Sequence, residues 1–152
     1  GVLAERLIFK KLTISTAESC TGGLIGKRLT DVAGSSTYFL GSITAYSNKL
    51  KTGLLGVSEN TLQAHGAVSE EVALEMAEGI LNNTHADIGI STTGISGPDG
   101  GSEEKPTGLV YIGVVTPGIS RVKKYIFRVK RHIHREMAAT AALNITRLSL
   151  EG

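Results

Sequence analysis

The sequence is poor in cysteine, aromatic residues and long apolar runs, and each shortage excludes a class of protein. Cys20 is the single cysteine among 152 residues, so no internal disulfide can form, which fits a reducing compartment. Tryptophan is absent and aromatic residues make up 5% of the chain, too few for a base-stacking surface. No run reaches the roughly 18 apolar residues of a membrane span, and no basic-then-apolar leader opens the chain. We therefore expect a cytoplasmic protein that neither enters a membrane nor binds nucleic acid.

The composition is that of one ordinary globular domain. Hydrophobic residues make up 41% and charged residues 20%, so we expect a single domain over residues 1–152. The net charge of +2 is too small to indicate a nucleic-acid partner. Basic residues crowd into residues 121–135, which indicates either a solvated basic face or one or two arginines that hold an anionic ligand.

Strand patterns and helix patterns alternate along most of the chain. Strands are expected at residues 12–16, 39–47, 86–93, 109–116 and 121–129, the last two joined as a hairpin by Pro117-Gly118. Helices are expected at residues 2–11, from 24 to a stop at Gly34, at 48–55, after a cap at Ser69, and at 132–149, with 57–68 as a loop. This order predicts an α/β fold: a three-layer α/β/α sandwich on a mixed, mostly parallel sheet of about five strands.

Ser19 lies at the carboxyl end of the first predicted strand and precedes a predicted helix, in the run Ala17-Glu18-Ser19-Cys20-Thr21-Gly22-Gly23. Ligands of open α/β sheets bind outside the carboxyl ends of strands. A helix start also offers unpaired N–H groups to a phosphate or an oxyanion, and Gly22 and Gly23 leave that approach open. Thr21 can cap the helix. From the spacing alone two interpretations stay open, a plain helix cap or a serine nucleophile.

A serine nucleophile needs a base, and in this sequence lysine is a better candidate than histidine. The four histidines are expected at the surface, and no Ser-His-Asp arrangement can be argued. Lys49 and Lys51 follow the second strand, which brings them near Ser19 if the first two strands are neighbours. Burial would let either lysine lose its proton, and Tyr46 could orient the base or relay a proton. No HExxH or CxxC spacing occurs, so neither a metal nor another cofactor is expected.

A long loop, Gly94 to Gly108, follows the third predicted strand at its carboxyl end. Loops of this length in compact domains are usually functional or disordered. Its five glycines and two prolines indicate unusual backbone angles. The loop therefore either lies close to a ligand or is a mobile surface segment.

Several motifs in one order resemble the CinA C-terminal domain family, and the resemblance covers residues 3–149. They are Ala17-Glu18-Ser19-Cys20-Thr21-Gly22-Gly23, Gly34-Ser35-Ser36, Tyr46-Ser47-Asn48 with Lys51, His65-Gly66-Ala67-Val68-Ser69, and Gly94-Ile95-Ser96-Gly97-Pro98-Asp99-Gly100-Gly101 running to Lys105-Pro106. The family's characterised enzymes are nicotinamide-nucleotide amidohydrolases, also called NMN deamidases. The resemblance thus implies a hydrolase of pyridine-nucleotide salvage and NAD metabolism.

The same resemblance implies a Ser–Lys dyad that needs no metal, in a protein that forms homo-oligomers. Ser19 would be the nucleophile and Lys51 its general base, with Tyr46 assisting. Attack on the carboxamide of nicotinamide mononucleotide (NMN) would release ammonia and leave an acyl-enzyme, from which water releases nicotinate mononucleotide. Contacts with the substrate are expected from Thr21, Gly22, Gly23, Thr93, Gly94, Ser96, Gly97 and Arg131.

The start of the last helix departs from the family pattern. Many members carry Gly-Asp-Arg there, whereas this chain has Val129-Lys130-Arg131. The arginine is kept, so we expect Arg131 to hold the substrate phosphate, with Arg135 as the second candidate. The loss of Gly-Asp favours an alternative function, a non-catalytic nucleotide-binding or regulatory module of a competence/damage-inducible CinA protein.

Overall fold

The five strands form one mixed sheet in the order β2-β1-β3-β4-β5. β1 (Ile14–Glu18) pairs in parallel with β2 (Phe39–Thr44) and with β3 (Ile88–Gly94). β4 (Leu109–Thr116) runs antiparallel to β3 and to β5 (Ile119–Ile126), so four of the five strands point the same way. The predicted mixed sheet is confirmed, and its first two strands are neighbours, which is the condition for bringing the lysines after β2 near the end of β1.

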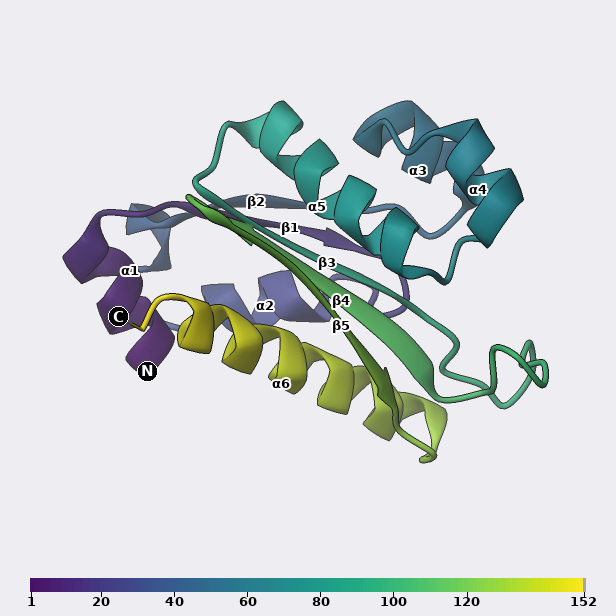
Figure 1. The fold of residues 1–152 in the computed structure, drawn as a ribbon. Coiled ribbons are helices and arrows are strands. Elements are labelled where there is room, and N and C mark those ends of the chain that lie inside the picture. The colour runs from purple at the N-terminus through teal and green to yellow at the C-terminus, as the bar shows by residue number, and fades with distance from the viewer. Residues whose placement is uncertain (152) are drawn as a thin grey trace.

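Helices cover both faces of this sheet, as the predicted α/β/α sandwich requires (Figure 1). The computed structural model describes residues 1–151, so the last residue of the expected domain, 152, lies outside the described part. One face carries α3 (Asn48–Leu55), α4 (Glu59–His65) and α5 (Glu70–Thr84), and the other carries α1 (Val2–Lys10), α2 (Leu24–Thr30) and α6 (Arg131–Ser149), while a short 3₁₀ turn at Ser35–Thr37 precedes β2.

Alternation along β1 divides its side chains between two hydrophobic cores. Ile14 belongs to the core under α2 and α6, whereas Ala17 belongs to the core under α5. Successive side chains of a strand point to opposite faces, so Glu18 lies on the same face as Ile14, towards α2. This alternation therefore places the Glu18 side chain on the face of the sheet that α2 and α6 cover.

α3 is docked on α5 through a close backbone contact. A Cβ at Gly79 would lie 1.9 Å from the Leu55 carbonyl oxygen, so only glycine permits this approach. Asn83 Nδ2 donates to the Leu54 carbonyl oxygen at 2.8 Å. At the other end of α3 the Ser47 hydroxyl accepts the Leu50 N–H at 3.2 Å. The C-terminal end of α3 is therefore held against α5, while the N-terminal end is closed by its own cap.

α4 corrects the expectation of a loop at residues 57–68. This helix spans Glu59–His65 and has no fully buried residue. Leu62 is its partly buried contact with the core under α5. Seven residues with one apolar contact do not show the repeated i, i+3, i+4 pattern on which helix prediction depends.

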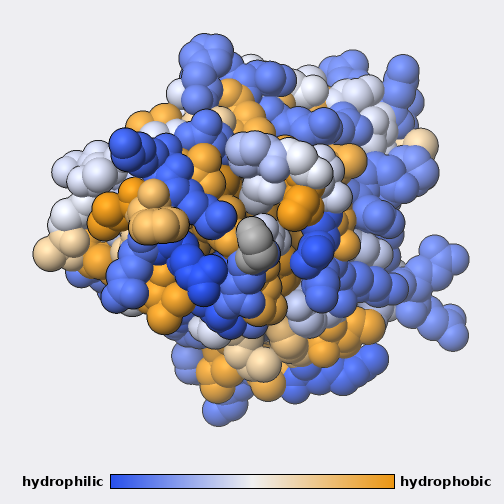
Figure 2. All heavy atoms as spheres, turned by 60° about the vertical axis from the view of Figure 1, so that its left-hand side comes forward, coloured by the Kyte–Doolittle hydropathy of each residue, from blue (hydrophilic) through white to orange (hydrophobic). Residues whose placement is uncertain are grey.

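Apolar side chains reach the surface at the α1 end of the molecule. Figure 2 turns this end towards the viewer and shows apolar patches among hydrophilic residues. In α1, Val2 and Ile8 are each 51% exposed and Phe9 is 85% exposed. Within residues 1–151, no helix has both the length and the apolar character needed to cross a membrane. The expected homo-oligomer stays a prediction.

Candidate active site

The candidate residues gather at one end of the sheet, where the carboxyl ends of β1, β2 and β3 meet (Figure 1). Ser19 follows β1, and its N–H donates to the Thr92 carbonyl oxygen of β3 at 3.0 Å. Lys51 lies in α3, which follows β2, and Arg131 opens α6. Segments far apart in the sequence thus meet at the position where ligands of open α/β sheets bind.

Ser19 and Lys51 form a buried hydrogen-bonded pair. Lys51 Nζ lies 3.0 Å from Ser19 Oγ and donates at 2.9 Å to the carbonyl oxygen of Tyr46. Ser19 is 7% exposed and Lys51 is 2% exposed. A nucleophile and its base must lie within hydrogen-bond reach and be held in one orientation. The geometry meets both conditions, because the Tyr46 carbonyl fixes the amine.

Burial lowers the pKa of Lys51 below its ordinary value of 10.5. Within residues 1–151, no carboxylate forms an ion pair with its ammonium. The neighbouring Cys20 supplies no counter-charge, since burial raises the pKa of its thiol to about 11 and keeps it neutral near pH 7. Desolvation without a counter-ion favours the neutral amine, the form that can accept a proton from Ser19.

Tyr46 contributes to this pair through its backbone rather than its phenol. The Tyr46 hydroxyl accepts a hydrogen bond from Arg131 Nη2 at 3.2 Å, and the residue is 63% exposed. No hydrogen bond joins this hydroxyl to Ser19 or Lys51 among the described residues. The structure therefore separates two roles of Tyr46: its carbonyl orients Lys51, and its hydroxyl faces Arg131.

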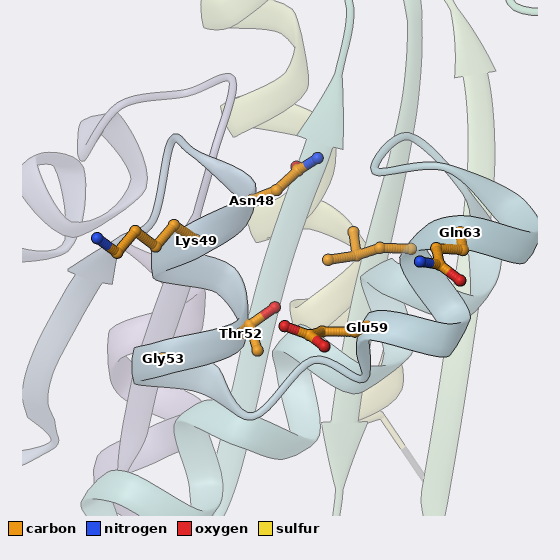
Figure 3. A pocket seen from close by; sticks show the side chains of 7 residues that line it. Asn48, Lys49, Thr52, Gly53, Glu59 and Gln63 are labelled. Atoms are coloured by element: carbon orange, nitrogen blue, oxygen red, sulfur yellow. The ribbon is translucent and has the colours of Figure 1, made fainter.

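The other candidate base, Lys49, lies on a different side of α3. It is exposed and lines a groove of about 590 Å³ between α3 and α4. Figure 3 shows its side chain extending away from Glu59 and Gln63, with Asn48 and Thr52 closer to them. The two alternatives that the sequence left open are thus resolved by geometry, with Lys51 on Ser19 and Lys49 in solvent.

Glu18 is a buried residue whose role the sequence analysis missed. Its carboxylate accepts the N–H groups of Gly23, Ile25 and Gly26 at 3.2, 2.9 and 2.9 Å. It also accepts the hydroxyls of Thr16 at 3.0 Å and Thr21 at 2.6 Å. Glu18, not Thr21, therefore caps the start of α2. The sequence feature that could have indicated this role is an acidic residue just before a helix start, where the helix dipole favours anions.

This cap changes where an oxyanion could bind. Because Glu18 occupies the amide groups at the helix start, they are not free for a ligand, contrary to the expectation. In the turn itself, the Gly22 N–H donates to the Ser19 carbonyl oxygen at 3.1 Å. Within the described chain, no other residue accepts a hydrogen bond from the N–H groups of Cys20 and Thr21. These two groups, next to Ser19, are the available donors.

Three of the expected substrate contacts have side chains that are already engaged. The Thr21 hydroxyl is fully buried between Glu18 and Thr92, and the Thr93 hydroxyl donates to the Ala67 carbonyl oxygen at 2.7 Å. Ser96 is 5% exposed and bonded to His134. Substrate contacts from these residues, and from the four glycines Gly22, Gly23, Gly94 and Gly97, would have to use the backbone, and they stay predictions.

Arg131 lines a groove of about 520 Å³ between the loop after β3 and the start of α6. Its Nη1 donates to the Gly97 carbonyl oxygen at 2.8 Å. Lys130 lines the same groove, so two cationic side chains face it. Arg135, the second phosphate candidate, lies elsewhere: it donates to the carbonyl oxygens of Cys20 and Thr21.

The comparisons with known proteins agree with this architecture. Residues 1–150 match the family described as the CinA C-terminal domain. The chain belongs to this family. It is 53% identical over 149 residues to a CinA-like protein of Chloroherpeton thalassium and 50% identical over 149 residues to one of Leptospira biflexa, covering 95% and 97% of this chain. In both cases the match covers 36% of the relative, so the chain spans just over a third of the length of these CinA-like proteins.

Solved structures of the CinA superfamily share the fold. A competence or damage-inducible protein from Enterobacter asburiae superposes with a TM-score of 0.95 at 30% identity, covering 99% of this chain and 94% of that one. A competence/damage inducible protein from Agrobacterium tumefaciens gives a TM-score of 0.88 at 39% identity, covering 97% and 93%. These likenesses support the CinA fold along nearly the whole domain.

His134 is a second residue of this CinA domain that the sequence analysis misjudged. It was expected at the surface but is fully buried. Its ring nitrogens lie 2.9 Å from the Gly108 carbonyl oxygen and 2.8 Å from Ser96 Oγ. A carbonyl only accepts, so Nε2 carries the proton and Nδ1 accepts the Ser96 hydroxyl. His134 thereby joins both ends of the 94–108 loop to α6.

Within residues 1–151, no three His, Cys, Asp or Glu side chains converge as metal ligands would.

Acid is expected to weaken this contact. Burial lowers the pKa of His134 below 6.5, and the Arg131 charge acts in the same direction. Between the folded pKa and 6.5 the unfolded chain binds more protons than the folded one. The free energy of unfolding should therefore fall as the pH drops from about 7 towards the folded pKa. Urea unfolding of His134→Gln should lack this part of the pH dependence, whereas the exposed His132→Gln should keep it; identical pH profiles in all three proteins would contradict the assignment.

Proposed function

We propose that this chain is an amidohydrolase that converts NMN to nicotinate mononucleotide and ammonia with a Ser19–Lys51 dyad. The proposal rests on one observation above all, the 3.0 Å contact between Lys51 Nζ and Ser19 Oγ in a buried setting. A buried lysine without a counter-ion is costly to the fold, and perturbed pKa values of this kind gather at functional sites. NMN is proposed as the substrate because the surrounding motifs resemble a family whose characterised enzymes act on it.

In the first half-reaction Ser19 Oγ attacks the carboxamide carbon while neutral Lys51 accepts the hydroxyl proton. The carbonyl oxygen becomes an oxyanion, and the free N–H groups of Cys20 and Thr21 are the donors beside it. The tetrahedral intermediate then breaks the carbon–nitrogen bond. Lys51 returns its proton to the leaving nitrogen, so ammonia departs and an acyl-Ser19 ester remains.

The second half-reaction repeats the proton transfers with water. Lys51 accepts a proton from water as its oxygen attacks the ester carbon. Collapse of the second intermediate breaks the bond to Ser19 Oγ, which recovers its proton from Lys51. The product leaves as the carboxylic acid of nicotinate mononucleotide, which gives its proton to ammonia or water to become the carboxylate, and Ser19 and Lys51 return to their starting states.

The phosphate end of the substrate is assigned to the groove at Arg131. Tyr46 connects the two ends of the site, since its carbonyl contacts Lys51 and its hydroxyl contacts Arg131. Arg131 contacts Gly97 at this groove in a chain where Val129 and Lys130 stand in place of the Gly-Asp of the family pattern. A lysine at position 130 adds a cation where the substrate carries its negative charge, which is compatible with phosphate binding.

Replacing Arg131 by alanine should raise KM for NMN by about 10- to 100-fold, the range expected for losing one charge-assisted hydrogen bond. The value of kcat should change little, because the phosphate lies away from the reacting amide. Steady-state kinetics checks this, with the exposed Arg128→Ala as the matched arginine control. A fall in kcat at unchanged KM would place Arg131 in the chemistry instead.

The proposed activity is tested by incubating the native chain with NMN and measuring ammonia and nicotinate mononucleotide. Equal amounts of both are expected. Added hydroxylamine should divert part of the acyl-enzyme to a hydroxamate, which a direct attack of water on the amide would not form. Thermal stabilisation by NMN without ammonia at any pH from 6 to 10 would contradict the proposal and indicate the alternative, a nucleotide-binding module.

A further inference from the structure

We propose that Arg135 is a positioning residue for the oxyanion site, which it serves by holding the Cys20–Thr21 and Thr21–Gly22 peptide groups, the first of which carries the free Thr21 N–H. This inference rests on the proposed amidohydrolase function. It differs from a role in phosphate binding, because the guanidinium is bonded to the nucleophile turn and not to the groove at Arg131.

The contacts of Arg135 are specific to the turn. Its Nε donates to the Cys20 carbonyl oxygen at 3.1 Å, and its Nη2 donates to the Thr21 carbonyl oxygen at 3.0 Å. A Cβ at Gly22 would lie 3.0 Å from Nη2, and Gly22 has a φ of +61°. Glycine at this position therefore serves both the left-handed backbone and the close approach of the guanidinium.

A count of the polar backbone groups shows what this arrangement leaves free. The Ser19 N–H is bonded to β3, the Ser19 carbonyl accepts the Gly22 N–H, and the Thr21 carbonyl also accepts the Leu24 N–H at 3.1 Å. With the Cys20 and Thr21 carbonyls on Arg135, the groups of the turn without a protein partner in the described chain are the exposed Gly22 carbonyl and two donors, the N–H groups of Cys20 and Thr21. Arg135 thus completes a turn whose only unused donors are next to Ser19.

The chemical consequence follows from the structure of the peptide group. The Cys20 carbonyl and the Thr21 N–H belong to one planar unit, so fixing the carbonyl fixes the direction of the N–H. A charge-assisted hydrogen bond to the carbonyl also polarises the unit and strengthens its N–H as a donor. Donors aimed in advance at the developing charge stabilise the transition state more than the ground state.

The test is steady-state kinetics of Arg135→Gln and Arg135→Lys with two substrates, NMN and its phosphate-free nucleoside. We expect kcat/KM to fall by about 10- to 100-fold with both, through kcat, which is somewhat less than the loss of an oxyanion donor itself. Lysine should retain part of the activity, because an ammonium can bond one of the two carbonyls. Added guanidinium ion should restore part of the activity of Arg135→Ala. Arg147→Gln, on the same helix near its other end, is the matched control and should behave as wild type.

Two results would overturn the inference. A rise in KM for NMN alone, with the nucleoside unaffected, would make Arg135 a phosphate ligand. Unchanged kinetics in folded Arg135→Gln and Arg135→Lys would leave it no role in the chemistry. If the wild type releases no ammonia from NMN, the proposed function fails, and the rate of Ser19 acylation by p-nitrophenyl acetate tests Arg135 independently. Slower acylation in Arg135→Gln would then support the inference, and equal rates would overturn it.

Discussion

Replacement of Lys51 by methionine is expected to lower kcat for NMN by about 10³-fold or more without loss of stability. The fall in kcat is expected because Lys51 is the only base within hydrogen-bond reach of Ser19 Oγ among the described residues. General-base catalysis contributes about 10²–10⁴-fold. Lys51→Arg should be equally inactive, since guanidinium does not give up its proton near neutral pH. Ser19→Ala should lose at least about 10⁴-fold, because the covalent route disappears.

The stability part follows from the burial of the ammonium. Methionine fills the same space without a charge, so the melting temperature should be equal to or above that of the wild type at pH 7. The pKa of Lys51 is lowered by burial, so between its folded pKa and 10.5 the unfolded chain binds more protons. The free energy of unfolding of the wild type should therefore rise relative to that of Lys51→Met as the pH rises through this window.

Calorimetry from pH 7 to 10 measures this difference, and ammonia release measures the activity. Lys49→Met is the matched control: it lies two residues away in α3 but is exposed, so both properties should stay close to wild type. The dyad assignment is refuted if Lys51→Met keeps a tenth or more of the wild-type kcat. A strongly lowered melting temperature would show instead that Lys51 serves the fold.

Replacement of Glu18 by alanine is expected to be the most destabilising single change in the site. The carboxylate accepts five hydrogen bonds, and its removal leaves buried N–H groups at the start of α2 without partners. Loss of one partner from a buried charged network costs about 3–5 kcal/mol. For a chain of this length that corresponds to a melting temperature lower by about 10 °C.

Denaturant unfolding and calorimetry of Glu18→Ala and Glu18→Gln test this expectation. Glutamine should be intermediate, because it keeps one acceptor oxygen but turns an amide towards other donors. Glu70→Ala is the matched control, an exposed glutamate in the first turn of α5, where the loss should stay within about 1 kcal/mol. Equal unfolding free energies for Glu18→Ala and Glu70→Ala would show that Glu18 is not needed for the helix start.

Much of the fold was predictable from local pattern, and the exceptions have one physical cause. α3, the cap at Ser69 and the hairpin at Pro117-Gly118 depend on neighbouring residues, so their signals are in the sequence. α4 was missed because its contact with the core under α5 is made by one apolar residue. The burial of His134 was not predicted because it depends on contacts with Gly108 and Ser96, which lie 26 and 38 residues earlier in the chain.

The sequence by itself determined that Ser19 lies just beyond a strand, that two lysines follow the next strand, and that a long glycine-rich loop follows another. Strand and helix periodicity are local properties, so these placements did not need the tertiary structure. Only the tertiary structure decided which lysine meets Ser19, that Glu18 caps α2, and that Arg135 holds the turn. Each of these depends on the direction of a side chain after the layers pack, and the lowered pKa of Lys51 depends on the burial that packing produces.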